Sequence, residues 1–157
     1  MRDSYVLFRD TLHAVSARSA LLQRDLRSAS DALLHSRARG IEIACTASLS
    51  LLVRSRNAML GVPLARRATA PQRTALDKSL TELRTTLTSC STEFKALAAR
   101  DSTGEPRDRA RGQAVKNLAS IRNFEGAADP FLLSLGIRVR PYGAGANPYA
   151  GSSATRN

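Results

Sequence analysis

Apolar residues recur every three or four positions along two long stretches of the chain, a spacing that lines side chains up along one side of an α-helix. One stretch consists of Tyr5, Phe8, Leu12, Val15, Ser19, Leu22, Leu26, Ala29 and Leu33. The other consists of Leu76, Leu80, Leu83, Leu87, Cys90, Phe94 and Leu97. Steps of three and four in alternation form the heptad repeat of helices that pack side by side. Both stretches therefore predict long helices that pack against other helices.

The first helix is expected over residues 4–38, because neither glycine nor proline interrupts the sequence from Arg2 to Arg39. Gly40 is a natural residue to follow a helix end, since glycine readily adopts the left-handed conformation found there. A serine in the apolar repeat leaves open a single break of this helix near residues 16–19.

Residues 41–53 alternate apolar and polar side chains, which is the period of a β-strand. Such a strand would be long for a globular protein, and the one segment that could pair with it, residues 137–140, is short and precedes a proline. We therefore expect a helix over residues 41–60, ended by Gly61 and Pro63.

A linker over residues 62–70 leads into the second heptad stretch. Thr69 can cap the next helix, Pro71 lies in its first turn, and Gln72 follows the cap by three residues, as in a capping box. This helix is expected to run to about Arg100.

Two shorter helical segments are expected after that. The first begins at Pro106 and ends at Gly126. Its inward-facing side chains are expected to be Val115, Leu118, Ile121 and Phe124. The second begins at Asp129 and Pro130 and makes one short turn of helix before Gly136.

The predicted fold is all-α, either an antiparallel helical bundle or a coiled-coil hairpin, formed by residues 1–135. Residues 136–157 are expected to form an extended tail. From Ile137 onward the tail holds two Pro, three Gly, two Tyr and three Arg and no acidic residue. A segment of this composition cannot bury enough apolar surface to fold alone, so it is expected to become ordered only on binding.

The chain is strongly basic, with a formal net charge of +11 and 21 Arg against 3 Lys. Arginine presents a planar set of donors that matches carboxylate and phosphate groups. The excess of base is spread along the chain, whereas a dedicated DNA-binding arm would show a block of like charge. The composition favours an acidic protein partner or a nucleic acid.

Candidate contact residues come from the densest basic cluster and from the tail, where tyrosines lie near arginines. They are Arg107, Arg109, Arg111, Arg138, Arg140, Tyr142 and Tyr149. The cluster has the alternative interpretation of a solvated helix face. The tail residues could stack on single-stranded bases, or they could anchor the tail in a groove of another protein.

The sequence contains no motif for catalysis or for a cofactor. Serines and threonines are scattered without a nucleophile elbow, and the G-x-G after Tyr142 lacks the third glycine of a dinucleotide site. His13 and His35 fall beside the apolar repeat, away from carboxylates and nucleophiles, so both are expected on flanking or exposed surface. We therefore expect no enzymatic activity and no cofactor.

The two cysteines, Cys45 and Cys90, lie within apolar patterns. We expect small buried hydrophobic residues in a mitochondrial or other reducing intracellular compartment, with a disulfide between them as the alternative. Together with the two histidines they form no recognised zinc spacing, so no metal site is expected. No apolar run approaches the roughly 18 residues of a membrane-spanning helix.

The hexapeptide from Leu7 to Leu12, with Leu7, Phe8 and Arg9 at its start, resembles the opening helix of the LYR-motif family. Phe8 stands where the family has a tyrosine, and Leu12 matches a later leucine. His13 replaces the usual arginine, and the family's downstream phenylalanine is missing. The resemblance covers residues 4–60.

This resemblance implies a small, basic, helical mitochondrial protein that serves as an accessory subunit or assembly factor of a large complex. By the same resemblance its partner would be an acyl carrier protein, whose acidic helix would meet basic side chains. Residues 71–157 would then be an extension outside the family pattern.

These features favour a non-catalytic structural or accessory subunit of a large macromolecular assembly, such as a mitochondrial ribosome or a respiratory complex. In this hypothesis, helix packing, surface arginines and the tail bridge other protein subunits of the complex, with RNA as an alternative partner of the arginines. The alternative is a basic nucleic-acid-binding protein associated with ribosomal RNA or virion DNA. A self-associating coiled-coil module is the third hypothesis.

Overall fold

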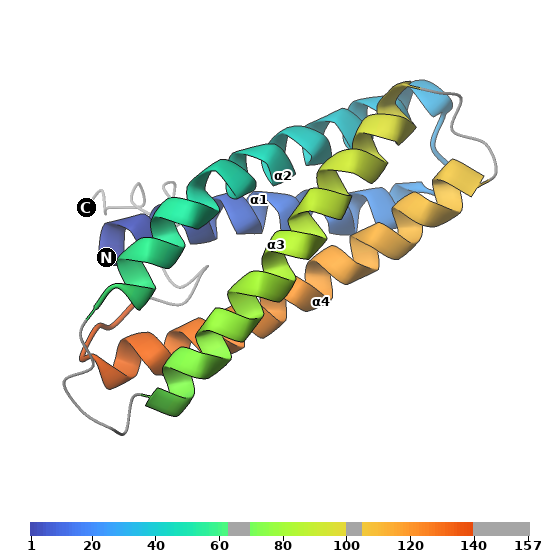
Figure 1. Cartoon of the computed structure of the whole chain (residues 1–157). Helices are drawn as coiled ribbons and strands as arrows, with labels where there is room; N and C mark the ends of the chain where they lie inside the picture. The colour runs from blue at the N-terminus through green and yellow to red at the C-terminus, as the bar shows by residue number, and fades with distance from the viewer. Residues whose placement is uncertain (63–69, 100–104, 140–157) are drawn as a thin grey trace, which may run out of the picture.

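Four long helices form a bundle in the computed structural model, which describes residues 1–62, 70–99 and 105–139 (Figure 1). The helices are α1 (Arg2–Asp25), α2 (Asp31–Leu60), α3 (Ala70–Ala99) and α4 (Glu105–Ser134). Helices that follow each other in the chain run in opposite directions and pack together, and α4 also packs against α1. The prediction of an all-α antiparallel helical bundle is confirmed, and the described residues contain no strand.

The two predicted apolar seams form the centre of the bundle. In α1 the side chains from Tyr5 to Leu26 at the heptad positions are all buried, and in α3 every heptad position from Leu76 to Leu97 is buried. Phe124 of α4 packs edge-on against Phe8 with ring centroids 5.5 Å apart. Large aliphatic and aromatic side chains at regular spacing therefore position both helices as expected.

The first helix ends at Asp25 and the second begins at Asp31, so the prediction of one helix over residues 4–38 was wrong. Ser30 caps α2, because its Oγ accepts a hydrogen bond from the backbone N–H of Leu33 at 3.4 Å. This break shifts the register by one residue. Leu34 is therefore fully buried, whereas Leu33 is 40% exposed, and Gly40 lies inside α2 instead of ending a helix. No break occurs near residues 16–19.

The helix predicted over residues 41–60 is confirmed, although it begins earlier, at Asp31. Its buried seam consists of Leu34, Ala38, Ile41, Cys45, Ser48, Leu52, Ser55 and Met59. This is an unbroken heptad repeat, but half of its positions hold small or polar residues. The strand-like alternation arises because apolar residues also lie on the opposite, exposed side of α2, where Ile43 and Val53 are found.

Helix α4 is continuous, so the prediction of two separate segments was wrong. Pro130 lies within the helix and lacks the N–H that would bond to the carbonyl of Gly126. Gly126 lies on the exposed side of the helix, where a missing backbone hydrogen bond costs less than it would in the core. The helix ends at Ser134, and Gly136 makes the turn that follows, with a φ of +75° that suits glycine.

The inward face of α4 was only partly predicted. Ile121 and Phe124 are buried as expected, but Leu118 is partly exposed and Val115 is 54% exposed. The seam in this half of the helix is formed instead by residues that give little hydrophobic signal. They are Ala110, Gln113, Ala114 and Asn117.

A polar cluster lies in the middle of the core. Asn117 donates from Nδ2 to Ser19 Oγ at 3.2 Å and to Cys90 Sγ at 3.1 Å. Gln113 donates from Nε2 to Asn117 Oδ1 at 2.8 Å and to the carbonyl of Thr86 at 3.1 Å. The cluster joins α1, α3 and α4, and buried polar groups with satisfied partners favour one register of the helices over others.

Cys45 of α2 and Cys90 of α3 form a disulfide, with Cα atoms 6.2 Å apart. Both residues are fully buried, as expected. They are not free thiols, however, so the expectation of reduced cysteines was wrong and with it the argument for a reducing compartment. Each cysteine occupies a position of the buried seam of its helix, and these two positions face each other where α2 packs against α3.

The remaining predictions about helix ends concern residues at the edge of the described part. The helix expected to run to about Arg100 is α3, while Thr69, its predicted cap, and Arg100 itself lie outside the described residues. Of the predicted tail, residues 136–139 are described and the rest are not. No helix in the described part of the chain is both long and apolar enough to cross a membrane.

Candidate interaction surfaces

The basic cluster on α4 is engaged within the chain. Arg107 donates from Nη2 to Asp31 Oδ1 at 3.3 Å and to a backbone carbonyl just before α2. Arg109 pairs with Glu93 of α3 at 3.3 Å, and Arg111 lies 3.9 Å from Asp108. Arg107 and Arg109 therefore hold the start of α4 beside α2 and α3, whereas the Arg111 pair lies within α4. Each exposed pair contributes little to stability.

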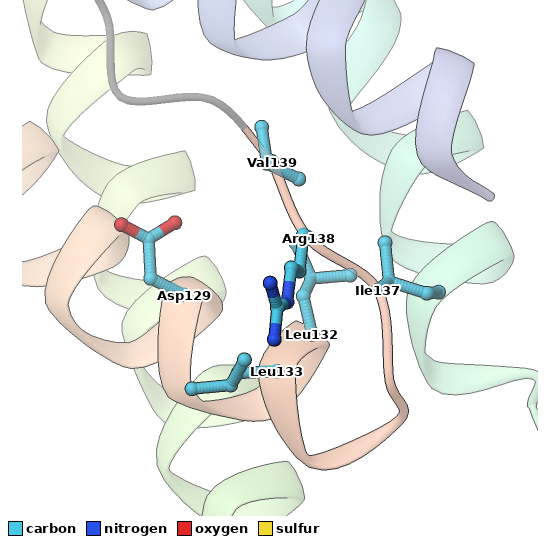
Figure 2. Close-up of a pocket in the computed structure, with 6 residues that line it drawn as sticks. All are labelled: Asp129, Leu132, Leu133, Ile137, Arg138 and Val139. Carbon is cyan, nitrogen blue, oxygen red and sulfur yellow. The ribbon is translucent and has the colours of Figure 1, made fainter.

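A hollow of about 240 Å³ lies at the far end of α4, where the chain turns back (Figure 2). Its lining residues are Asp129, Leu132, Leu133, Ile137, Arg138 and Val139. The turn is made by Gly136, and the N–H of Ile137 bonds to the carbonyl of Leu132 at 2.9 Å. Figure 2 shows Arg138, one of the predicted contact residues, extending over this hollow. Arg140, Tyr142 and Tyr149 lie outside the described residues.

The carboxylate in this hollow already has a partner. Tyr5 of α1 donates its hydroxyl hydrogen to Asp129 Oδ1 at 2.9 Å. Burial raises the pKa of Tyr5 well above its ordinary value, and the hydrogen bond to Asp129 raises it further. Asp129 thus serves to link α4 to α1, and Arg138 is the charged group that the hollow offers to a ligand.

The three residues of the family resemblance have different environments. Leu7 is 52% exposed and lines a small hollow of about 110 Å³ beside Leu51 and Arg54. Phe8 is fully buried in the core. The guanidinium of Arg9 lies over the ring of Tyr5, 5.7 Å from its centre. Among the three, only Leu7 offers its side chain broadly to a partner.

His13 lies beside a carboxylate that is distant from it in the sequence. Its Nε2 atom lies 2.9 Å from Glu125 Oε1, which joins α1 to α4. The pair of His13 and Glu125 therefore links α1 to α4. No three His, Cys, Asp or Glu side chains in the described part of the chain gather where they could hold a metal ion.

A shallow groove of about 480 Å³ runs between α3 and α4. It is lined by small residues together with Lys78, Glu82 and Arg122. Lys78 lies 4.0 Å from Glu82, and 80% of its side chain is exposed. The groove therefore offers two cations on facing helices.

The outward side of α2 is the surface that sequence reasoning missed. Ile43 is 60% exposed and Val53 is 57% exposed. They belong to a second heptad seam, half a turn away from the buried one. Its positions are Arg39, Ile43, Thr46, Ser50, Val53 and Asn57, all of them exposed.

This outer seam is free of charge in its middle. Residues 43–53 contain no charged side chain, in a chain of which 24% is charged. The Thr46 hydroxyl is paired with that of Ser91 at 3.1 Å, and Ser50 Oγ donates to the carbonyl of Thr46 at 3.0 Å. Covering these hydroxyls would therefore cost little, since they keep their partners. The absence of charged residues from 43 to 53, together with the helical spacing of Ile43 and Val53, could have indicated this surface from the sequence.

Comparison of the chain with protein-family models, with curated proteins and with solved structures found no match.

Proposed function

We propose that this chain is a non-catalytic helical scaffold, an accessory subunit that binds other protein chains through the outer seam of α2. The observation that supports the proposal is the pair of exposed aliphatic side chains, Ile43 and Val53, in an uncharged stretch of a strongly basic surface. Scattered exposed hydrophobic residues are common, but two on one side of one helix with no charge between them favour contact with another protein.

The expected gain from covering this seam comes from its two large residues. Complete burial of an aliphatic side chain contributes about 1.5–3 kcal/mol. The small residues Thr46, Ala47 and Ser50 between them allow another helix to approach closely. A helical partner with small or aliphatic side chains is therefore the best match.

A photo-crosslinking residue placed at Ser50 of the full-length chain tests this proposal in cells that express it. The matched control carries the same residue at Val115, which is also exposed but lies on α4. We expect covalent adducts with protein from position 50, few from position 115, and loss of the former when Ile43→Arg is added. Equal adducts from both positions, or none from position 50, would contradict the proposal.

Nucleic-acid binding is the second candidate, and the groove between α3 and α4 favours it because Lys78 and Arg122 face a common hollow. Binding of duplex RNA or DNA would then weaken steeply with salt, by roughly one power of ten in affinity per tenfold salt for each phosphate contact. The Arg122→Gln variant should reduce the slope of log affinity against log salt concentration by about one, because it removes one phosphate contact. Binding that does not depend on salt would exclude this candidate.

A further inference from the structure

The outer seam of α2 has an internal symmetry that suggests its partner. Its six positions are arranged in steps of four, three, four, three and four around a centre at Ser48. The four inner residues at equal distances from this centre are alike in size, Ile43 with Val53 and Thr46 with Ser50, whereas the outermost pair is Arg39 with Asn57. A twofold dimer buries the same patch of both copies, so that patch must be complementary to itself after a rotation of 180°.

We propose that the chain forms a twofold dimer in which two copies of α2 pack antiparallel along their outer seams, an inference that rests on the proposed function. Centred at Ser48, this arrangement sets Ile43 beside Val53 of the partner subunit and Thr46 beside Ser50 of the partner subunit. These pairs form the layers of an antiparallel coiled coil. The uncharged residues 43–53 fill the middle of the contact.

Charge favours the antiparallel direction. Glu42 precedes the uncharged stretch, whereas Arg54 and Arg56 follow it. Antiparallel helices centred at Ser48 place Glu42 level with Arg54 of the partner subunit and the seam residue Arg39 level with Asn57 of the partner subunit, whereas parallel helices would place each charge level with its own copy. Arg56 is already paired with Asp77 of α3, whereas Glu42 and Arg54 form no ion pair within the described residues and are available for such contacts.

The surface beside the seam is compatible with the contact. The hydrogen bond between Thr46 and Ser91 brings α3 beside the seam, and the exposed Thr85, Thr88 and Thr92 of α3 each donate a hydroxyl hydrogen to the carbonyl four residues earlier. Their hydroxyls are thus satisfied within the helix, and a copy that approaches along α2 would meet no unpaired charge on them. With a net charge of +11, two copies would repel each other over most other surfaces.

Sedimentation equilibrium of the purified full-length chain tests the dimer. We expect Ile43→Arg and Val53→Arg each to weaken dimerisation by at least about tenfold, because they place a charge in the apolar contact. Val115→Arg is the matched control, and it should remain dimeric with unchanged helicity. A monomer at all concentrations, or equal weakening by the control, would overturn the inference.

Cysteine trapping tests the direction of the helices, because the two native cysteines are joined and buried. A mixture of Ile43→Cys and Val53→Cys chains should form a mixed disulfide upon mild oxidation, while neither chain alone should form one. Self-linking of Ile43→Cys alone would indicate a parallel pair and contradict the inference. If the chain is monomeric but the Ser50 crosslink to a different protein persists, the dimer fails and the proposed function stands; if both are absent, both fail.

Discussion

At the scale of single residues, the polar side chains in the core are fixed by partners on other helices. Asn117 contacts Ser19 of α1 and Cys90 of α3, and Tyr5 bonds to Asp129 of α4. Buried polar groups are costly unless they are hydrogen-bonded, so each such group selects the arrangement that satisfies it. Apolar seams alone would tolerate helices shifted along one another far more easily.

Tyr5 should make stability depend on alkaline pH. Burial, followed by its bond to Asp129, raises its pKa above the ordinary value of 10.0. In the unfolded chain Tyr5 ionises near that value, whereas the folded chain keeps it protonated. The stabilisation that protonated Tyr5 gives the folded chain is therefore complete below about pH 10. It is lost as the pH rises towards the pKa of Tyr5 in the folded chain.

Urea unfolding of the wild type and Tyr5→Phe, from neutral pH to about pH 11, measures this contribution. At neutral pH the variant should lose about 1 kcal/mol, the value of one buried hydrogen bond. Above about pH 10 the wild type should lose stability more steeply than the variant. Identical pH profiles for the two proteins would show that Tyr5 is not protected in the fold.

At the scale of helices, the sequence predicted α1 and α3 better than α2 and α4, for a physical reason. Large side chains fill the seams of α1 and α3, so their periodicity was visible. The seam of α2 includes Ala38 and Ser48, and that of α4 includes Ala114 and Asn117. Small and polar residues give little periodic signal, and their burial depends on neighbours that are distant in sequence.

The interaction surfaces were less predictable than the fold. Arginine spacing indicated Arg107 and Arg109, but it could not reveal that Asp31 and Glu93 would lie beside them in space. The outer seam was present in the sequence, yet its residues and those of the buried seam together produced an alternation typical of a strand. Only the position of α2 in the bundle shows which of the two seams faces outward.

Gly40 provides a test of the boundary between α1 and α2. A Cβ atom added there would meet only Arg18, at 3.8 Å, which is an ordinary contact. Because Gly40 lies inside α2, Gly40→Ala should stabilise the protein by about 0.5–1 kcal/mol in urea unfolding. Gly136→Ala is the control and should destabilise it, since Gly136 has a φ of +75°. A loss of stability at Gly40 would instead indicate a helix end at that residue.

At the scale of the whole molecule, the disulfide links α2 to α3 across the core. Its cysteines are 45 residues apart in sequence, so it restricts a long loop in the unfolded chain. Loop-closure entropy for that length gives about 4 kcal/mol of stabilisation. This is a large share of the about 5–15 kcal/mol that a domain usually has.

The Cys45→Ala and Cys90→Ala double variant should therefore lose about 2–4 kcal/mol in urea unfolding while it keeps its helical content. Thiol titration of the denatured wild type should detect no free thiol until a reductant is added. Two free thiols in the unreduced protein, or unchanged stability of the double variant, would contradict the disulfide seen in the fold.

The disulfide joins two helical hairpins, α1 with α2 and α3 with α4, which the backbone also connects. A protease that cut any single peptide bond between Cys45 and Cys90 would produce two polypeptides that remain covalently joined by the disulfide. Such a nicked molecule would separate on an electrophoresis gel only after treatment with a thiol. Backbone continuity between the hairpins is therefore not what keeps them associated.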